Sequence, residues 1–264
     1  MAEFRLLILG GTTEGRGLAR AAIERFGDRL DVLSSLAGVV DDPVLPPGRV
    51  RVGGFGGVEG LRRFLRDERI DAMIDATHPF ARHMQANAAA ACAADAVPRC
   101  RLSRPPWAKQ DGDRWIAVGS PADAAAAVPA LGRRVFLALG ARDLAPFLTL
   151  ADTWLLLRGI NPPDRTLTNG RFLQARGPFD LAAEEALLRD HRIDVVVSRQ
   201  SGGTGAGAKI EAARRLGLPV VMIERPPPPA PPLVATIADA MAWLEPRIVL
   251  RAEALATGAA GDAV

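Results

Sequence analysis

The sequence predicts an α/β protein with two Rossmann-like, doubly wound domains whose sheets are mainly parallel. Short apolar runs alternate with glycine-rich turns and amphipathic helical segments, and this alternation occurs twice along the 264 residues. Several apolar runs are continuous in Val, Ile and Leu, which is typical of parallel strands that helices cover on both faces. At roughly 150 residues per domain, the length also fits two domains.

The first array of elements lies within residues 1–102, which are expected to form the first domain. Apolar patterning predicts strands at residues 4–9, 30–35, 50–52, 70–75 and 99–102. Helical spacing of apolar residues follows at residues 18–26, 60–69 and 80–94. Helices between successive strands are the crossovers that parallel pairing requires.

The second array predicts strands at residues 135–139, 154–157, 172–175, 195–197 and 220–223. Helices are expected at residues 181–189, 206–216 and 237–244. We therefore expect a second domain over residues 133–250, with a boundary or connecting region at residues 103–132. The proline run at residues 226–232 is expected to be a stiff connector, and residues 251–264 a flexible tail.

The composition excludes several classes of protein. With 48% hydrophobic and 24% charged residues, the chain can bury a core and is not wholly disordered. No apolar run approaches the roughly 18 residues that span a bilayer, so no membrane association is expected. The first ten residues lead directly into a strand pattern and lack the features of a signal peptide. Cys92 and Cys100 alone form no disulfide framework, and a reducing, cytoplasmic location is expected.

Charge and side-chain chemistry narrow the function further. A net charge of +3 and the absence of Tyr weigh against nucleic acid as a partner. Three histidines and two cysteines do not make a persuasive metal site, so no metal is expected. The sequence contains no HExxH motif and no spacing typical of a catalytic triad. An enzyme with this sequence would therefore depend on a bound cofactor for its chemistry.

The first glycine-rich turn, Gly10-Gly11-Thr12-Thr13-Glu14-Gly15, directly follows the first predicted strand and opens a helix. Amide groups and the helix dipole at such a position suit a pyrophosphate. The dinucleotide fingerprint has glycines at its first, third and sixth positions, whereas here Thr12 stands at the third. A tight turn without a ligand is the alternative. The strand–turn–helix context favours a dinucleotide site formed by Gly10, Gly11, Thr12 and Thr13.

The end of the second predicted strand indicates which dinucleotide binds. NAD-binding domains carry an acidic residue there, which binds the ribose 2′-hydroxyl and repels a 2′-phosphate. This chain has Ser34-Ser35-Leu36-Ala37-Gly38 instead, so NADPH or NADP is favoured, with Ser34 and Ser35 as binding residues. No arginine follows directly, which leaves the partner of the 2′-phosphate open.

Two further loops of the first domain are candidate cofactor sites. Four glycines within residues 53–57 let a ligand approach the backbone near Gly54, although a flexible surface turn explains them equally well. Residues 75–81 lie at the carboxyl end of the fourth strand, where open α/β sheets bind ligands. Thr77 and His78 are therefore candidates for contact with the nicotinamide half or the substrate. His78 is also compatible with a capping or packing role.

The second domain carries two glycine-rich corners with cations. Residues 198–209 are not a Walker A loop, because Ala208 separates Gly207 from Lys209 and Ile210 replaces the magnesium-binding hydroxyl. What remains is an anion-binding nest that suits carboxylates as well as phosphates. Gly140-Ala141-Arg142-Asp143 forms a similar corner. Arg16, near the start of the first helix of the first domain, could add a further cation. The candidate substrate-binding residues are therefore Arg16, Arg142, Arg199, Ser201, Gly202, Gly203, Thr204 and Lys209, while solvated surface cations are the alternative.

Several segments together resemble the precorrin-6A reductase family, in the right order over about residues 4–245. They are residues 8–15 (ILGGTTEG), 35–38 (SLAG), 75–81 (DATHPFA), 201–205 (SGGTG), 209–220 (KIEAARRLGLPV) and 224–226 (ERP). Each segment is weak alone, and jointly they are specific. The family often has a basic residue after Ser-Leu-Ala-Gly, where this chain has Val39 and Val40. That departure again leaves the partner of the 2′-phosphate open.

The resemblance implies a reductase that uses NADPH to reduce one C=C or C=N unit of a tetrapyrrole in cobalamin biosynthesis, converting precorrin-6A into its dihydro form, of the precorrin-6B type. It implies that residues 1–102 bind NADPH and residues 133–250 bind the tetrapyrrole. The carboxylates of this substrate suit a site rich in Arg and Lys. Transient contacts with neighbouring pathway enzymes are compatible with this role.

The sequence does not identify a catalytic residue. His78, solvent and a substrate carboxyl are equally compatible with the role of proton donor. Two other functions stay open: an NADP-dependent reductase of another acidic metabolite, and a non-catalytic NADP-binding sensor.

Overall fold

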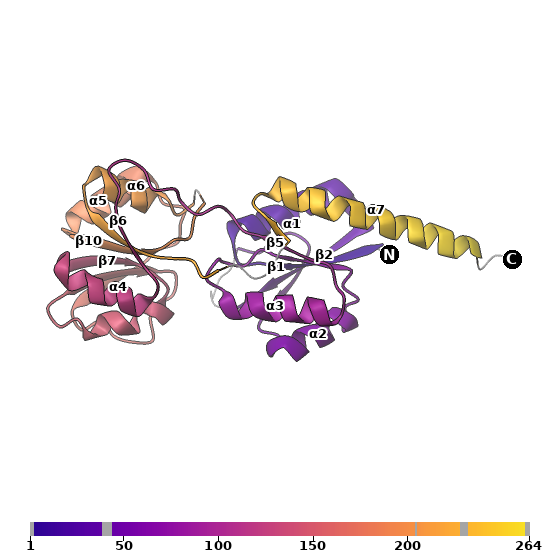
Figure 1. Ribbon diagram of the computed structural model, residues 1–264, viewed down its shortest axis with the longest axis horizontal. Coiled ribbons are helices and arrows are strands. Elements are labelled where there is room, and N and C mark those ends of the chain that lie inside the picture. The colour runs from indigo at the N-terminus through magenta and orange to yellow at the C-terminus, as the bar shows by residue number, and fades with distance from the viewer. Residues whose placement is uncertain (1–2, 39–43, 204, 228–231, 262–264) are drawn as a thin grey trace. The chain divides into compact units, whose positions relative to one another are not determined.

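The computed structural model describes residues 3–38, 44–203, 205–227 and 232–261. The chain divides into two compact units. Unit 1 comprises residues 1–104 and 227–264, and unit 2 comprises residues 105–226. Within the described residues, each unit contains a six-stranded sheet flanked by helices (Figure 1). Both sheets are parallel, which confirms the predicted α/β fold with two Rossmann-like domains.

The sheet of unit 1 has the strand order β12-β5-β4-β1-β2-β3. Its strands are β1 (Phe4–Leu9), β2 (Leu30–Leu36), β3 (Arg49–Val52), β4 (Ala72–Asp75), β5 (Arg99–Leu102) and β12 (Leu233–Val234). In the parallel register, Leu9 at the end of β1 lies opposite both Ser35 of β2 and Asp75 of β4. The strand order therefore reverses between β1 and β4, which is where Rossmann domains bind their ligands.

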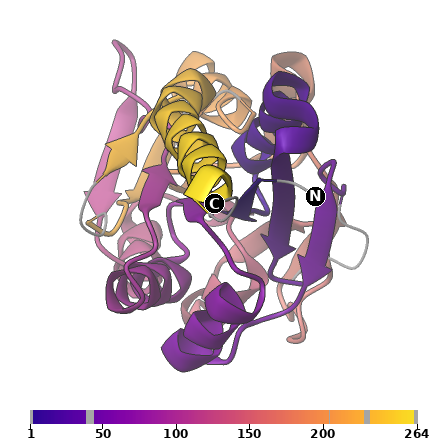
Figure 2. The same ribbon diagram turned by 90° about the vertical axis from the view of Figure 1, so that its right-hand side faces the viewer.

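Helices cover both faces of this sheet. The helices α1 (Thr13–Phe26) and α7 (Ile237–Gly261) lie on one face, and α2 (Gly57–Asp67) and α3 (Arg82–Ala94) lie on the other (Figures 1 and 2). Side chains of β1 alternate between the two cores: Leu6 and Ile8 pack with α1 and α7, whereas Leu7 and Leu9 pack with α2 and α3. This burial on both sides is the reason for the uninterrupted apolar run in β1.

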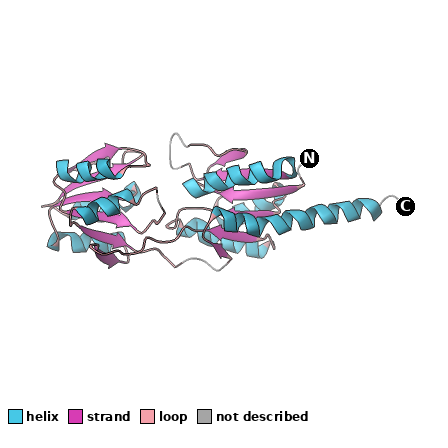
Figure 3. Cartoon of the chain, turned by 90° about the horizontal axis from the view of Figure 1, so that it is seen from above, coloured by secondary structure: helices cyan, strands magenta, loops and turns pink. Residues whose placement is uncertain are grey.

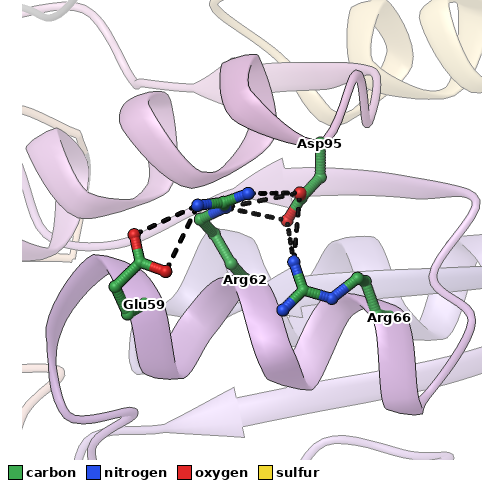
Figure 4. Close-up of polar contacts among 4 residues, drawn as sticks. All are labelled: Glu59, Arg62, Arg66 and Asp95. Carbon is green, nitrogen blue, oxygen red and sulfur yellow. Dashed lines mark hydrogen bonds and ion pairs between the residues drawn. The ribbon is translucent and has the colours of Figure 1, made fainter.

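A charge cluster ties α2 to the end of α3 (Figure 4). Arg62 donates hydrogen bonds to Glu59, one turn earlier on α2, and to Asp95, the residue that follows α3. Arg66 also donates to Asp95. These hydrogen bonds, chiefly from Arg62, hold the pKa of the Asp95 carboxyl below its usual range. These surface contacts fix α2 and α3 relative to each other, while the apolar faces of both helices pack on the sheet.

The sheet of unit 2 has the order β6-β11-β10-β7-β8-β9. Its strands are β6 (Arg114–Val118), β7 (Arg134–Ala138), β8 (Trp154–Gly159), β9 (Gly170–Gln174), β10 (Val195–Arg199) and β11 (Pro219–Ile223). The helices α5 (Leu181–Asp190) and α6 (Ala208–Arg215) pack on one face, and α4 (Pro121–Ala127) lies on the other (Figure 1). A buried ion pair between Arg158 of β8 and Glu184 of α5 lies in this unit.

The edge strands overturn the domain boundaries that the sequence predicts. Residues 103–132, expected to be a connecting region, contain β6 and α4 of unit 2. Residues 227–250, expected in the second domain, belong to unit 1, where β12 pairs with β5 and α7 packs beside α1 (Figure 3). The sheet of unit 1 thus takes its last strand, β12, from beyond the whole of unit 2, and local patterning carries no information about such distant pairing.

The C-terminal segment also differs from the prediction. A helix was expected at residues 237–244 and a flexible tail at residues 251–264, but α7 continues to Gly261. The segment is rich in Ala, the residue with the highest helix propensity, and this outweighs its lack of apolar periodicity. The proline run at residues 226–232 lies largely outside the described residues. Among the helices that the structure describes, none has the length and apolar character to cross a bilayer.

Both cysteines are free and buried in the folded chain. Loss of solvent raises the pKa of Cys92 to about 12 and that of Cys100 to about 11, because the thiolate is poorly solvated in the core. We expect iodoacetamide at mildly alkaline pH to modify neither cysteine in the native protein and both after unfolding in urea, as measured by mass spectrometry. Rapid alkylation of the native chain would contradict the packing around β4 and β5.

Candidate functional site

The turn between β1 and α1 is held by Thr12. Its side chain is buried, and Oγ1 accepts a hydrogen bond from the Gly15 amide (3.0 Å) while donating to the Ala76 carbonyl (2.7 Å). Thr12 is therefore the N-cap of α1 and also fastens this turn to the segment that follows β4. Its side chain faces inward, so Thr12 leaves the open side of the turn clear although it replaces a fingerprint glycine.

The glycines of this turn fit the roles that a dinucleotide site requires. A Cβ on Gly15 would lie 3.3 Å from the Gly10 Cα, so Gly15 allows the close approach of helix and strand. Gly11 has φ +95° and faces open space. Helix geometry leaves the amides of Thr13 and Glu14 without acceptors inside α1, and these donors with the helix dipole suit a pyrophosphate. The residues present therefore fit the diphosphate of a dinucleotide.

Two arginines lie near the start of α1. Arg104 pairs with the Glu14 carboxylate at 2.6 Å and so offsets a negative charge that would repel a bound phosphate. Arg16, predicted from the sequence as a substrate residue, donates to the Thr13 hydroxyl at 3.3 Å. Arg16 thus lies in unit 1 with the predicted cofactor residues. Arg104 was not singled out in the sequence, because only the fold brings the residues after β5 to the first helix.

The segment after β4 is organised by a fully buried ion pair. Asp75 receives a hydrogen bond from Arg101 of β5 at 2.7 Å, and the two side chains are 0% and 3% exposed. The other carboxylate oxygen of Asp75 accepts from the amide and the hydroxyl of Thr77. Asp75 is therefore committed to holding Thr77 at the edge of the sheet and is not available as an acid or a base.

Thr77 lines a small recess at the carboxyl ends of β1, β4 and β5. The lining residues are Thr12, Glu14, Ala76, Thr77, Pro79, Leu102, Ser103 and Arg104. His78 is not part of this lining. Its Nδ1 accepts from the Phe80 amide at 3.3 Å, and the buried Gln85 donates to its carbonyl. The structure thus brings Thr77 beside the dinucleotide turn and gives His78 a place in the local hydrogen bonding.

Ser34 and Ser35, the two residues predicted at the end of β2, lie in different environments. The Ser34 hydroxyl is buried and has no hydrogen-bond partner among the described residues. The Ser35 hydroxyl accepts a hydrogen bond from Arg51 of β3 at 2.8 Å. Arg51 also donates to the carbonyls of Gly53 and Gly54. The sequence analysis missed Arg51, and the available signal was its position at the end of the strand that neighbours β2.

In unit 2, the corner after β7 meets the end of β10. Arg199 forms an ion pair with Asp143, and burial lowers the pKa of the Arg199 guanidinium. Arg142, between Gly140 and Asp143, is exposed. These strands are neighbours in the sheet and mark the reversal of strand order in unit 2, so the predicted Arg142 and Arg199 lie at its equivalent ligand-binding edge.

The glycine-rich loop after β10 is fixed by side chains around it. Trp107 donates from its indole nitrogen to the Gly203 carbonyl (2.7 Å), and Arg225 donates to the carbonyls of Gln200 and Ser201 (both 2.7 Å). Gly202 has φ +64°, and a Cβ there would lie 2.1 Å from a backbone oxygen, so no other residue fits. Thr204 lies outside the described residues.

Lys209 is more deeply buried than the sequence suggested. It is 7% exposed, its Nζ donates to the Ala206 carbonyl at 2.7 Å, and the ammonium lies 5.1 Å from the centre of the Trp107 ring. Lys209 therefore holds the backbone of the glycine-rich loop at Ala206 and adds a positive charge to that loop. Among the described residues, no group of three or more His, Cys, Asp or Glu side chains could bind a metal.

Known proteins resemble this chain in sequence and in fold. The sequence profile of the precorrin-6x reductase CbiJ/CobK family matches residues 5–245. The chain belongs to this family. Among precorrin-6x reductases, the precorrin-6A reductase of Rhodococcus erythropolis is 48% identical over 91% of this chain and 97% of its own. The cobalt-precorrin-6A reductase of Priestia megaterium is 29% identical over 84% of this chain and 90% of its own.

A solved structure supports the fold of this precorrin-6x reductase family member. The structure described as CobK precorrin-6A reductase superposes with a TM-score of 0.87 at 45% identity and covers 92% of this chain and 97% of its own. Family membership makes the chain an oxidoreductase of tetrapyrrole biosynthesis that uses a nicotinamide cofactor.

The buried pair beneath the recess should be costly to break. Arg101→Met leaves Asp75 buried without its charge partner, and we expect the free energy of unfolding to fall by about 3–5 kcal/mol. The control Arg66→Met removes an exposed guanidinium from Asp95 and should cost about 1 kcal/mol or less. Urea unfolding followed by circular dichroism compares the two. Equal losses would mean that the Asp75 carboxylate finds water or another partner.

Proposed function

We propose that the chain catalyses the NADPH-dependent reduction of precorrin-6A to its dihydro form, of the precorrin-6B type, in cobalamin biosynthesis. The observation that carries this proposal is the division of chemistry between the two units of a precorrin-6x reductase. Unit 1 has a dinucleotide turn that fits a diphosphate, and unit 2 has cationic, glycine-rich corners at its own ligand-binding edge. A polycarboxylate macrocycle suits the second set and a phosphorylated dinucleotide the first.

In unit 1, the cofactor would bind along the edge of the sheet, with its diphosphate at the turn between β1 and α1. The amides of Thr13 and Glu14, with Gly10 and Gly11 leaving space beside them, would bind the diphosphate. Thr77 lines the recess on the β4 side and would contact the nicotinamide half. Ser35 at the end of β2, with Gly54 in the loop after β3, lies on the opposite side of the turn, where the ribose would bind. When bound, the nicotinamide would supply a hydride for one ring carbon of the substrate, and a proton would add to its neighbour.

In unit 2, cations would bind the substrate carboxylates. Arg142 is exposed after β7, and Arg199 is oriented by Asp143. Lys209 donates to the Ala206 carbonyl, in the same glycine-rich loop as Ser201, Gly202 and Gly203. Binding several carboxylates at once fixes the orientation of the ring system, which raises the rate by reducing the entropy lost at the transition state. Guanidinium groups suit this task because their planar fork matches a carboxylate.

The proton and the cellular setting belong to the same proposal. His78 is a titratable side chain in the segment beside the recess, and it is the protein candidate for proton donor, with solvent and a substrate carboxyl as the alternatives. Two buried, reduced thiols agree with a cytoplasmic enzyme. Transient contact with neighbouring enzymes of the pathway is compatible with this role.

The cofactor assignment is tested by titration. We expect saturable binding of NADPH, much tighter than that of NADH, measured by nicotinamide fluorescence or tryptophan quenching. Incubation with precorrin-6A under anaerobic conditions should then oxidise NADPH and add two hydrogens to the macrocycle, as seen by mass spectrometry. Binding of neither nucleotide would contradict the proposed function, whereas tight NADPH binding with no turnover of any tetrapyrrole would favour a sensor.

The substrate assignment is tested by a matched pair of arginines flanking β7. Arg142→Gln removes an exposed cation beyond the carboxyl end of this strand and should raise KM for the tetrapyrrole about 10-fold, the loss expected for one charge-assisted hydrogen bond. Arg133→Gln removes an exposed cation before its amino end and should leave KM unchanged. Kd for NADPH should stay constant in both. A change in NADPH affinity alone would refute the division of roles between the units.

A further inference from the structure

Arg51 lies in line with the dinucleotide turn along one edge of the unit 1 sheet. In the parallel register, Arg51 of β3 is opposite Ser35 of β2, and Ser35 is opposite Leu9, the last residue of β1 before the turn. In Rossmann domains, a diphosphate at the first helix places the adenosine ribose at the end of the second strand. Arg51 therefore stands on the strand beside the position expected for that ribose.

The guanidinium of Arg51 is held in a defined orientation. Nη1 donates to the Ser35 hydroxyl (2.8 Å) and to the Gly53 carbonyl (3.0 Å), and Nη2 donates to the Gly54 carbonyl (3.0 Å). The plane is supported by Phe55, whose ring centre is 4.0 Å from the guanidinium carbon. Such support reduces the conformational entropy that a long side chain would lose on binding an anion.

Charge distinguishes Arg51 from Arg49 on the same strand. Arg49 is paired with the carboxylates of Asp31 and Glu68, both at 2.9 Å. The partners that the structure shows for Arg51 are a hydroxyl, two carbonyls and aromatic rings, all of them neutral. Burial lowers the pKa of Arg51, whereas the carboxylates raise that of Arg49. Among the described residues no carboxylate pairs with Arg51, so an anion bound beside it would gain its positive charge.

The backbone next to this guanidinium faces open space. A Cβ built on Gly53 or on Gly54 would meet no atom within 4 Å. Gly53 has φ +122°, which accounts for glycine there, but neither a positive φ nor a packing contact accounts for Gly54. Neither backbone conformation nor packing requires glycine at position 54, and the guanidinium beside it pairs with no carboxylate among the described residues. This combination fits a site where a ligand approaches the backbone closely.

We propose that Arg51 binds the 2′-phosphate of the cofactor and determines the preference of this chain for NADPH over NADH. Ser35 acts as a positioning residue, since its hydroxyl holds Nη1, and the remaining N–H groups of the guanidinium are available to phosphate oxygens. This inference rests on the proposed use of NADPH. Arg51, on the neighbouring strand β3, would be the basic residue that the chain lacks directly after β2.

The test uses ligands that isolate the phosphate. Calorimetric titration of the full chain with 2′,5′-ADP and with 5′-ADP compares binding with and without the 2′-phosphate and needs no turnover. For Arg51→Gln we expect the Kd of 2′,5′-ADP and of NADPH to rise about 10- to 100-fold, the range for charge-assisted hydrogen bonds. The Kd of 5′-ADP and of NADH should change less than about 3-fold, since these ligands lack the phosphate that Arg51 contacts.

Two further variants separate charge from structure. Arg49→Gln removes a guanidinium from the same strand that is already neutralised, and it should leave the preference for NADPH unchanged. Arg51→Lys keeps the charge without the planar fork and should restore part of the affinity for 2′,5′-ADP. Circular dichroism and the melting temperature establish that each variant is folded.

The possible outcomes distinguish a failure of the role of Arg51 from a failure of the proposed use of NADPH. If the wild-type chain binds 2′,5′-ADP more tightly than 5′-ADP and Arg51→Gln keeps the same preference, the role of Arg51 is overturned. The proposed use of NADPH would then still stand. An equal loss of 2′,5′-ADP and 5′-ADP would overturn it as well, because the residue would then support the loop and not the phosphate. A wild-type chain that binds 2′,5′-ADP no better than 5′-ADP would overturn the proposed use of NADPH together with this inference.

Discussion

Parallel pairing of β1 with both β2 and β4 is the constraint on which the nucleotide-binding edge depends. Because Leu9 lies opposite Ser35 on one side and Asp75 on the other, the ends of three strands come to one edge. Thr12 then joins the dinucleotide turn to the chain after β4 through the Ala76 carbonyl. A shift of one residue in either pairing would turn these side chains to the opposite face of the sheet and dismantle the site.

Arginine serves two different purposes in this chain. Buried or partly buried arginines such as Arg101 and Arg158 are matched to carboxylates, which offsets the cost of removing their charge from water. Arg51 and Arg142 stand at the ligand-binding edges with neutral partners or in solvent. Arg199 combines the two, because its ion pair with Asp143 holds a cation at the ligand-binding edge of unit 2.

The central strands of the two sheets follow the same order, but their edge strands β6 and β12 come from different places in the chain. The strand β6 directly precedes the five other strands of its sheet, whereas β12 follows the whole of unit 2 and begins the return to unit 1 that α7 continues. The chain therefore passes from unit 1 to unit 2 and back. The fold of unit 1 is completed only when the C-terminal segment has packed, since α7 contributes Leu244 and Ile248 to the core beneath α1.

The sequence by itself determined the fold class, ten of the twelve strands that the structure describes, the dinucleotide turn and the family, because continuous apolar runs and glycine-rich turns are local signals. Only the tertiary structure decided where the domains divide, which charges are neutralised, and that Lys209 is buried. It also brought Arg51 beside Ser35, across sixteen residues of chain. Strand register and ion pairing join residues far apart in the sequence, and no local pattern encodes them.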